Sequence, residues 1–330
     1  MNKASPLLEI KDASIFFQVG NQRFGRGGNL IKAVDTVSLE LYKGEAVGLV
    51  GESGCGKTTL AKGVLKLVDL TSGSISFNGR NISNLKGSNL KNYRSKVAAV
   101  FQDPFSSLNP RMTSGKTISE VLQVHNYTGN INARAIELLE LCGLQSRFFN
   151  LYPHQMSGGQ RQRVCIARAL AIEPDLIVCD EAVSALDVSI QAQIINLLAE
   201  LQRKLNLTYL FIGHDLSVVR HLCDRVAVMY LGKIVEQAPS EELFSNPLHP
   251  YTQALIDAVP NPDPQKEMHR IINPLKGEPP SAMNPPTGCV FHPRCSIKLP
   301  KCTTEVPQVS GLSSDHLGAC FALNTIETLN

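Results

Sequence analysis

The sequence lacks the long apolar segments that cross membranes. No apolar run approaches the roughly 18–20 residues that a transmembrane helix requires. The stretch from Met1 to Asp12 is broken by Glu9 and Lys11 and has no apolar signal-peptide core. Charge is also scarce, at 18% Asp, Glu, Lys and Arg with a net charge of +3, which does not indicate nucleic-acid binding. We therefore expect a cytosolic protein without a nucleic-acid partner that, if it serves a membrane, does so as a peripheral subunit.

The nine cysteines are unevenly distributed along the chain. In a cytosolic protein we expect thiols or metal ligands rather than disulfides. Cys289, Cys295, Cys302 and Cys320 lie close together in the tail, whereas the others are scattered. None of these four belongs to the paired C-x₂-C of common zinc sites, so the spacing leaves both free thiols and a metal site open.

Strand patterns alternate with helical patterns along most of the chain. The strand patterns cover residues 7–19, 31–42, 46–50, 175–179, 208–212, 226–230 and 233–237. Residues 46–50, and residues 176–179 within the pattern at 175–179, are continuous apolar runs, which are typical of parallel strands buried on both faces. Amphipathic helical patterns follow these runs. The alternation predicts an α/β fold with a mainly parallel sheet.

Three segments depart from this alternation. A basic, Gly-rich segment at 20–28 predicts a hairpin loop between the first two strands. Two helical patterns among turns predict a helical subdomain inserted at about 103–170. From about Pro260, closely spaced prolines mark a linker into a Pro- and Cys-rich tail. We thus divide the chain into a main domain, residues 1–259, and a C-terminal extension, residues 260–330.

A complete phosphate-binding loop follows the strand pattern at 46–50. It consists of Gly51, Glu52, Ser53, Gly54, Cys55, Gly56, Lys57 and Thr58. The glycines of such a loop let successive backbone N–H groups converge on phosphate oxygens at a helix N-terminus. We expect Lys57 to reach the β- and γ-phosphates and Thr58 to offer its hydroxyl to Mg²⁺. Thr59 can add a donor beside the α-phosphate.

Polar side chains follow two of these predicted strands and a further strand pattern at 98–101. Asp180 and Glu181 come directly after residues 175–179, and ligands bind at this edge of a parallel sheet. We expect Asp180 to hold Mg²⁺ through water and Glu181 to polarise the attacking water. Gln102 is expected to reach Mg²⁺, and His214 the γ-phosphate. Taken alone, an Asp-Glu pair also suits a helix N-cap and a lone His a structural role; the phosphate loop upstream favours the nucleotide site.

A second Gly-rich turn opens a helix about a hundred residues after the phosphate loop. It runs from Met156 to Arg163 and contains Ser157, Gly158, Gly159 and Gln160. One chain carries one such turn and one phosphate loop. If both bind the same nucleotide phosphates, the working unit is a pair of such chains.

In this order the motifs resemble the nucleotide-binding subunit of an ATP-binding cassette (ABC) transporter. The matching segments are Gly51–Thr58, Gln102, Met156–Gln160, Asp180–Glu181, the D-loop Ser184-Ala185-Leu186-Asp187, and His214. The resemblance implies a P-loop NTPase core with an antiparallel β-subdomain and an inserted helical subdomain. It also implies that the signature turn, Ser157 to Gln160, acts on the ATP of the opposite subunit. An aromatic residue stacks on adenine in this family, and Phe17 is the best match, followed by Phe16.

Two positions depart from the usual pattern of the family. Met156 stands where the signature turn usually has Leu, and this is a swap of one apolar residue for another. Ala182 stands where Pro usually follows the Asp-Glu pair. We expect a slightly looser turn at Ala182 and no loss of chemistry.

Three further segments resemble importers of peptides and nickel. Residues 101–111 resemble the region that, in those importers, forms the groove for the coupling helix of the membrane subunit. Residues 249–255 and 277–280 resemble the C-terminal extension of the dipeptide/oligopeptide group. The resemblance runs from end to end and is closest to the F-type ATPases of dipeptide permeases.

The resemblance implies an ATPase that uses ATP and Mg²⁺ to power the import of dipeptides or short peptides. It would lie on the cytoplasmic face of the inner membrane as a peripheral subunit. The implied partners are a second, more often non-identical ATPase subunit, two integral-membrane permease subunits and, indirectly, an extracytoplasmic peptide-binding protein. Nickel chelate, haem or antimicrobial peptide stay open as cargo. Three functions compete with import: a soluble cassette ATPase acting on ribosomes or DNA, an Fe–S-dependent regulatory ATPase, and an exporter.

The resemblance also bears on the tail cysteines. Importers of this group with such tails resemble [4Fe–4S] proteins, which favours a cluster on Cys289, Cys295, Cys302 and Cys320. His292 could substitute as a ligand. Zinc and free thiols stay open as well.

Overall fold

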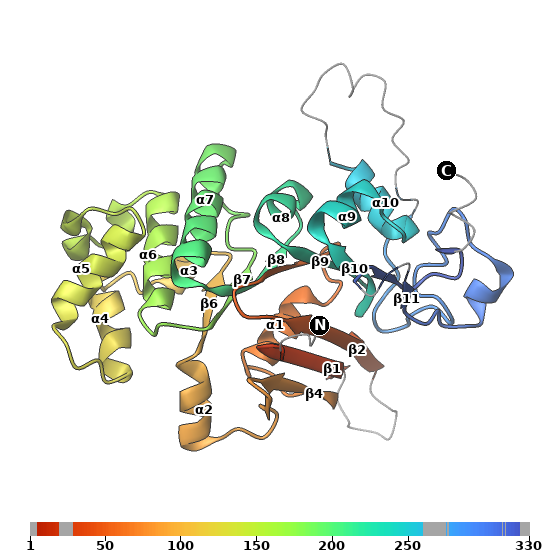
Figure 1. The fold of residues 1–330 in the computed structure, drawn as a ribbon, viewed down its shortest axis with the longest axis horizontal. Helices are drawn as coiled ribbons and strands as arrows, with labels where there is room; N and C mark the ends of the chain where they lie inside the picture. The colour runs from red at the N-terminus through yellow and green to blue at the C-terminus, as the bar shows by residue number, and fades with distance from the viewer. Residues whose placement is uncertain are drawn as a thin grey trace, which may run out of the picture. The chain divides into compact units, whose positions relative to one another are not determined.

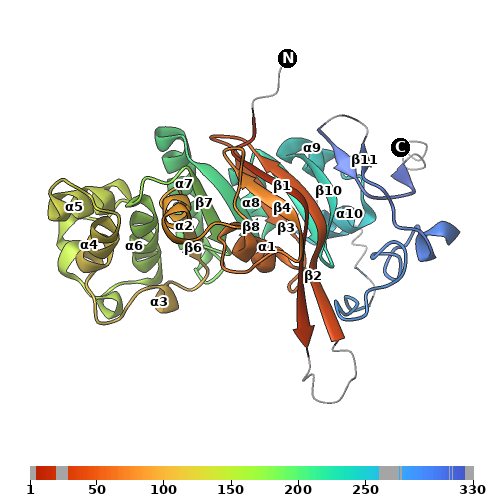
Figure 2. The same cartoon turned by 90° about the horizontal axis from the view of Figure 1, so that it is seen from below.

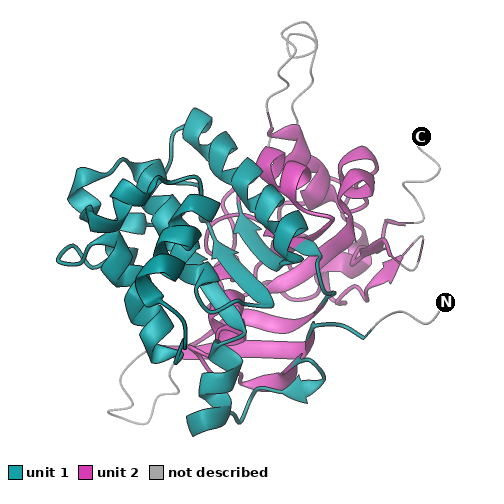
Figure 3. Ribbon diagram, turned by 60° about the vertical axis from the view of Figure 1, so that its left-hand side comes forward, with its two compact units in different colours: residues 1–8, 41–46, 77–213 teal, residues 9–40, 47–76, 214–330 magenta. Residues whose placement is uncertain are grey.

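The computed structural model (Figure 1) describes residues 5–19, 29–259, 275, 277–311, 313 and 315–323. The chain forms two compact units, shown in teal and magenta in Figure 3. Unit 1 contains Met1–Leu8, Leu41–Ala46 and Phe77–Gly213, and unit 2 contains Glu9–Glu40, Val47–Ser76 and His214–Asn330. Each unit therefore joins segments that are far apart in the sequence. The predicted loop over 20–28 and the start of the predicted linker at Pro260 lie outside the described residues.

Unit 1 is built around a parallel sheet. Its strands are β6 (Val97–Phe101), β7 (Leu176–Asp180) and β8 (Thr208–Gly213), with β7 in the middle. β7 pairs in parallel with both neighbours. All residues of β7 and β8 are buried. This burial is why residues 176–179 and 209–212 are continuous apolar runs in the sequence rather than alternating ones.

Helices make up most of the rest of unit 1. They are α2 (Gly87–Arg94), α3 (Pro104–Ser107), α4 (Ser114–Val124), α5 (Ile131–Leu141), the 3₁₀ helices η1 (Ser146–Asn150) and η2 (Pro153–Gln155), α6 (Gly158–Leu170) and α7 (Val188–Leu205). A two-residue strand, β5 (Arg80–Asn81), precedes them. α4, α5 and α6 pack against one another as the yellow and yellow-green helices of Figure 1. They form a helical subdomain inserted between β6 and β7.

Unit 2 contains two groups of strands. β2 (Asn29–Leu41), β1 (Leu8–Val19) and β4 (Ser72–Phe77) are neighbours in one sheet, in that order, and β1 and β2 extend side by side in Figure 2. In the other sheet, β3 (Ala46–Val50) pairs in parallel with β9 (Arg225–Tyr230). β9 pairs antiparallel with β10 (Lys233–Pro239).

The C-terminal tail adds strands to the edge of this second sheet. β12 (Leu317–Gly318) pairs antiparallel with β10, and β11 (Ser310–Gly311) pairs with β12. Strands of two residues carry no alternating pattern, so the sequence does not reveal them. The helices of unit 2 are α1 (Lys57–Val64), α8 (Leu216–Leu222), α9 (Ser240–Ser245), α10 (Pro250–Asp257) and the 3₁₀ helix η3 (Pro300–Thr303).

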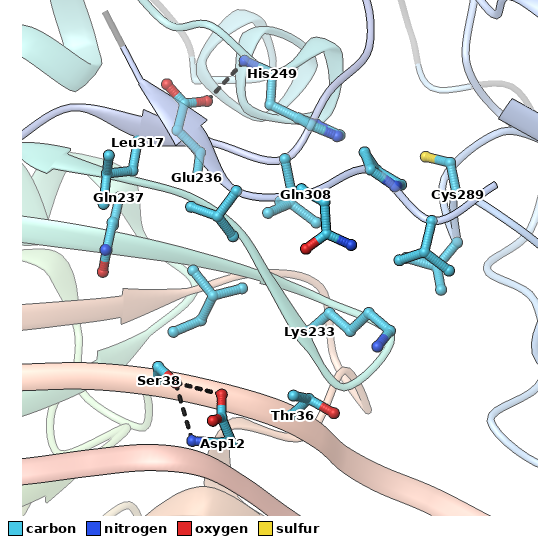
Figure 4. A pocket seen from close by; sticks show the side chains of 17 residues that line it. Asp12, Thr36, Ser38, Lys233, Glu236, Gln237, His249, Cys289, Gln308 and Leu317 are labelled. Carbon is cyan, nitrogen blue, oxygen red and sulfur yellow. Dashed lines mark hydrogen bonds between the residues drawn. The ribbon is translucent and has the colours of Figure 1, made fainter. Parts of the chain in front are cut away.

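A buried ionic cluster holds the tail against β10 and α9 within unit 2. His316 is fully buried between two carboxylates, with Nε2 2.8 Å from Glu236 Oε1 and Nδ1 3.1 Å from Glu242 Oε1. Glu236 also accepts the backbone N–H groups of Leu248 and His249, each at 2.8 Å; the second bond is dashed in Figure 4. Burial lowers the pKa of His316, but the hydrogen bonds to both carboxylates outweigh burial and raise it above its ordinary value. Only the imidazolium donates from both ring nitrogens, so protonation of His316 allows it to donate to both carboxylates.

This cluster makes the stability of unit 2 depend on pH. Because the folded pKa of His316 is raised above the unfolded value of about 6.5, its contribution is fully present below that value. The contribution is lost as the pH rises through the folded pKa. Burial lowers the pKa of the neighbouring His249 to about 4, so His249 stays neutral over this range. We expect the melting temperature to fall as the pH rises above about 6.5.

Thermal unfolding across this pH range, followed by circular dichroism, measures the effect. In His316→Gln the pH-dependent fall should be largely absent, even though the variant is less stable at neutral pH. His221→Gln replaces an exposed histidine on α8 and serves as the control. The same pH profile in His316→Gln and in the wild type would contradict the prediction.

Candidate functional site

The phosphate-loop residues lie between β3 and α1 in unit 2. Gly56 caps α1 with a φ of 111°, and Gly51 has a φ of 150°. A Cβ at Gly56 would lie 2.0 Å from the carbonyl oxygen of Ala33, and one at Gly51 would lie 2.1 Å from that of Met229. Both positions therefore require glycine, because the loop passes directly against the backbones of β2 and β9. The strand, loop and helix that the motif requires are all present.

Lys57 lies at the centre of the loop. Its side chain is buried, and its ammonium donates to the carbonyl oxygens of Gly51 at 2.7 Å and Glu52 at 2.9 Å. It also lies 3.6 Å from Cys55 Sγ. Burial raises the pKa of the Cys55 thiol more than the Lys57 ammonium lowers it, so Cys55 is a neutral neighbour. The exposed residues of the loop are Ser53, Gly54 and Thr58. A central cation with accessible loop residues around it can bind a phosphate group.

In unit 1 the strand register brings predicted catalytic residues to one edge of the sheet. Phe101 of β6 lies opposite Asp180 of β7, and Asp180 lies opposite Ile212 of β8. Gln102 and Glu181 each come one residue beyond these positions. The carboxyl ends of parallel strands are where ligands bind in open α/β sheets. Asp180, Glu181 and Gln102 are therefore neighbours at this edge of the sheet.

Glu181 is held in an unusual backbone conformation. Its φ of 50° lies in the left-handed region, which residues other than glycine adopt rarely. Its N–H donates to the carbonyl oxygen of Ile212 at 2.9 Å. Ser184 Oγ donates to the Glu181 carbonyl oxygen at 2.9 Å and lies 3.5 Å from Glu181 Oε2. Strain of this kind concentrates at functional sites. Ser184 therefore holds the backbone of Glu181 and lies beside its carboxylate, and the i, i+3 spacing is the only sign of this contact in the sequence.

α6 begins at the predicted signature turn. Ser157 is its N-cap and forms a capping box with Gln160. The Ser157 N–H donates to Gln160 Oε1 at 2.9 Å, and the Gln160 N–H donates to Ser157 Oγ at 3.4 Å. Gly159 requires glycine, because a Cβ there would lie 2.3 Å from Ile190 Cγ2. The turn is thus a rigid helix N-terminus, a site suited to an anion.

The signature helix contacts the segment that follows the carboxylates. Gln162 is fully buried, and its Nε2 donates to the carbonyl oxygen of Ala182 at 2.6 Å. A Cβ at Gly158 would lie 3.3 Å from Leu186 Cδ2. The D-loop residues Ser184, Ala185, Leu186 and Asp187 connect the segment that follows the carboxylates to α7, whose N-cap is Asp187. Unit 1 therefore brings the signature turn, the D-loop and the carboxylates together, and Gln162 anchors the turn at Ala182.

Comparison with known proteins decides the family. Residues 34–184 match the family described as "ABC transporter", and residues 235–302 match "Oligopeptide/dipeptide transporter, C-terminal region". The oligopeptide transport ATP-binding protein AppF of Bacillus subtilis is 51% identical over 95% of this chain and 96% of its own length. The oligopeptide transport ATP-binding protein OppF of Salmonella typhimurium is 47% identical over 97% of each chain. The chain belongs to the ATP-binding subunits of ABC transporters. It is therefore an ATPase.

Solved structures confirm the predicted fold class of this ABC subunit. The ATP-binding cassette MJ0796, described as dimeric in a post-hydrolysis state bound to ADP and Pi, has a TM-score of 0.62 at 29% identity, covering 71% of this chain and 98% of its own. The cbiO1 protein of Clostridium perfringens, part of the ABC transporter complex cbiONQ, has a TM-score of 0.63 at 26% identity, covering 74% and 92%. The fold is mixed α/β with an antiparallel sheet and a helical subdomain, whereas the Pro- and Cys-rich extension is not confirmed. In the part of the chain that the structure describes, no helix is both long and apolar enough to span a bilayer.

The ABC motifs are divided between the two units. Gln102, the signature turn, the carboxylates and the D-loop belong to unit 1, and the phosphate loop belongs to unit 2. Phe16 and Phe17 on β1 are also in unit 2; Phe17 is 40% exposed, and the Phe16 ring lies 5.6 Å from the Lys32 ammonium. His214 is exposed and directly follows the end of β8. The predicted site residues therefore form two sets, one in unit 1 and one in unit 2.

The four tail cysteines of this ABC subunit lie in unit 2. The pKa of Cys320 is raised to about 11, chiefly by burial and further by the electrostatic effect of Cys295, Cys289 and Cys302. Cys302 Sγ and Cys320 Sγ each accept a backbone N–H at 3.4 Å. His292 Nδ1 lies 2.9 Å from the carbonyl oxygen of Cys289. Among the residues with described positions, no three His, Cys, Asp or Glu form a group that could hold a metal ion, so the predicted iron–sulfur site lacks support here.

A separate cavity of about 590 Å³ lies in unit 2 (Figure 4). Its lining includes Lys233, Glu236 and Gln308, together with Cys289 of the tail. None of the residues predicted to bind nucleotide lines it. The cavity is therefore distinct from the phosphate loop of this ABC subunit.

Proposed function

We propose that the chain is the ATPase subunit of an importer for dipeptides or other short peptides. The observation that carries the proposal is the match of residues 235–302 to the C-terminal region of oligopeptide/dipeptide transporters. AppF and OppF, at 51% and 47% identity over nearly the whole chain, are both named as oligopeptide transport proteins. This agreement favours a peptide over a nickel chelate or haem as cargo.

In this proposal the phosphate loop binds the ATP of its own chain. Lys57 supplies positive charge to the β- and γ-phosphates. Thr58, Asp180 and Gln102 would hold Mg²⁺, because hydroxyl, carboxylate and amide oxygens are the ligand type that Mg²⁺ prefers. Bound Mg²⁺ would neutralise negative charge on the transferring phosphoryl group. Glu181 orients the attacking water and takes up its proton.

Three further groups complete the proposed nucleotide site. Thr59 and the backbone N–H groups of the phosphate loop add donors for phosphate oxygens. His214 contacts the γ-phosphate. The exposed ring of Phe17 stacks on adenine. Stacking holds the base through its flat face and does not require hydrogen bonds to its edge.

The signature turn serves the ATP of a second subunit in this proposal. Its support is the geometry of α6, which presents Gly158 and Gly159 at a capped helix N-terminus. MJ0796, one of the similar structures, is described as a dimeric cassette. We propose a non-identical homologous partner, so that each of the two ATP sites draws on both sequences.

The proposed membrane partners are two permease subunits, with an extracytoplasmic peptide-binding protein acting through them. The proposed contact surface is α3, in the 101–111 segment that follows Gln102. Phe105 on α3 is 62% exposed, and the Arg161 guanidinium lies 3.6 Å from its ring centroid. An exposed aromatic ring held by a cation is suited to a protein interface. The subunit would then lie on the cytoplasmic face of the inner membrane.

Affinity purification from detergent-solubilised membranes tests this assignment. We expect the wild-type chain to recover multi-span permease subunits, and cells lacking the chain to lose uptake of a labelled dipeptide. Phe105→Glu should reduce recovery of the permeases without lowering ATPase activity. Val124→Glu, on the exposed end of α4, is the matched control. Recovery of ribosomes or DNA in place of permeases would contradict the proposal.

We also propose that the four tail thiols bind a [4Fe–4S] cluster. The support is that all four cysteines belong to unit 2, that the other three raise the pKa of Cys320, and that two of the sulfurs accept backbone N–H groups. Because the thiols as described do not form a metal-binding group, cluster binding requires them to move closer together. Iron and sulfide analysis of anaerobically purified protein tests the idea, with Cys302→Ser as the loss variant and Cys142→Ser as the control. A metal-free, folded tail would exclude the cluster, and zinc without sulfide would assign the site to zinc.

A further inference from the structure

A residue of the C-terminal tail holds the phosphate loop within unit 2. Arg294 donates to both oxygens of the Glu52 carboxylate, from Nη1 to Oε2 at 2.7 Å and from Nη2 to Oε1 at 3.0 Å. The Arg294 side chain is 5% exposed and that of Glu52 is 27% exposed. The hydrogen bonds with Glu52 raise the pKa of Arg294, so the guanidinium keeps its charge. A two-point contact of this kind fixes geometry as well as charge.

Glu52 is also held through its backbone. Its N–H donates to Tyr251 Oη at 2.8 Å. The ring centroid of Tyr251 lies 4.7 Å from that of Tyr230 and 5.4 Å from that of Phe291, which belongs to the tail. Arg294 Nη1 lies 3.5 Å from Tyr230 Oη. The ion pair and the backbone hydrogen bond therefore depend on one aromatic cluster that the tail completes.

Glu52 connects this cluster to Lys57. The Glu52 carbonyl oxygen accepts a hydrogen bond from the Lys57 ammonium at 2.9 Å. A shift of Glu52 therefore moves one of the two carbonyl oxygens that hold this ammonium. The negative charge of the Glu52 side chain also bears on ATP binding. A carboxylate in a phosphate-binding loop repels a triphosphate, and Arg294 neutralises that charge at hydrogen-bonding distance.

We propose that Arg294 is a positioning residue for ATP binding, which fixes the phosphate loop through Glu52 and cancels the charge of the Glu52 carboxylate. The proposal rests on the assignment of the phosphate loop as the ATP site. It gives the tail a function in nucleotide affinity that is separate from its cysteines. Arg294 directly precedes Cys295. Displacement of this segment of the tail would break the contact between Arg294 and Glu52 and so weaken ATP binding.

Nucleotide affinity of the full-length Arg294→Gln variant tests the proposal. We expect the Kd for ATP to rise about tenfold or more, while kcat at saturating ATP stays within about twofold of wild type. The loss of affinity should shrink from ATP to ADP to AMP, because the freed carboxylate repels phosphates and not adenosine. Adding Glu52→Gln should restore part of the affinity for ATP. Arg294→Lys, which keeps the charge without the two-point contact, should be intermediate.

Arg134→Gln is the matched control, because it breaks ion pairs with Glu137 and Glu173 in unit 1. An unchanged Kd for ATP in Arg294→Gln, with normal binding by the wild type, would overturn the proposal. So would an equal loss for ATP, ADP and AMP together with a lowered melting temperature, which would indicate a structural role. Failure of the wild-type chain to bind ATP would instead overturn the assignment of the phosphate loop. If Arg294→Gln folds poorly, Glu52→Gln with Arg294→Gln provides the same comparison without an unpaired carboxylate.

Discussion

Glu181→Gln is expected to slow ATP hydrolysis by about 100-fold or more while ATP binding is retained. The amide keeps the size and hydrogen-bonding reach of the carboxylate but cannot accept a proton from the attacking water. The backbone of Glu181 is fixed by its N–H bond to Ile212, so the amide will occupy the same place. Phosphate release at saturating ATP measures the rate, and a fluorescent ATP analogue measures the affinity. Because ATP stays bound, we also expect the complex with the second subunit to persist.

Two variants of unit 1 separate chemistry from folding in this experiment. Glu200→Gln makes the same chemical change at an exposed position on α7 and should leave turnover unchanged. Ser184→Ala keeps the Glu181 carboxylate but removes the hydroxyl that donates to the Glu181 carbonyl oxygen and lies 3.5 Å from the carboxylate. We therefore expect Ser184→Ala to reduce turnover, by less than Glu181→Gln does. Wild-type turnover in Glu181→Gln would show that another group activates the water.

The core of the fold could be predicted from the sequence because its strands are short and completely buried. Residues 176–179 of β7 are apolar, since both faces of the strand are covered, and polar residues begin at Asp180, the last residue of the strand. Asp180 and Glu181 mark that point in the sequence as well as in space. The phosphate loop was predictable for a related reason. Gly51 and Gly56 occupy backbone conformations that other residues rarely adopt, so the sequence records the geometry directly.

The contacts of the tail could not be predicted in the same way. Arg294 and Glu52 are 242 positions apart, and their pairing leaves no periodic pattern in the chain. The same is true of His316, whose two carboxylate partners lie on β10 and α9. A charged residue usually indicates an exposed position, and a fully buried His or a 5% exposed Arg side chain is an exception that depends on its partner. The cysteine spacing is a weaker signal still, because it is compatible with thiols, zinc or an iron–sulfur cluster.

Lys57→Ala is expected to raise the Kd for ATP by about 10- to 100-fold, the usual range for loss of a hydrogen bond to a charged group. Lys57 is buried at the centre of the loop, and its ammonium is the donor that bridges the carbonyl oxygens of Gly51 and Glu52. Alanine removes the positive charge and that bridge together. Equilibrium binding of a fluorescent ATP analogue measures the change. Lys62→Ala, at an exposed position on the same helix, is the control and should bind ATP as the wild type does.

The comparison of Lys57→Ala with Glu181→Gln tests how the two units divide the reaction. Lys57 belongs to unit 2 and is expected to determine affinity, whereas Glu181 belongs to unit 1 and is expected to determine the chemical step. If that division holds, Lys57→Ala will raise the Kd, and enough ATP will recover part of the turnover. No concentration of ATP will rescue Glu181→Gln, because its site is already occupied. An unchanged Kd in Lys57→Ala would contradict the assignment of the phosphate loop, and loss of binding in Glu181→Gln would contradict the separation of binding from chemistry.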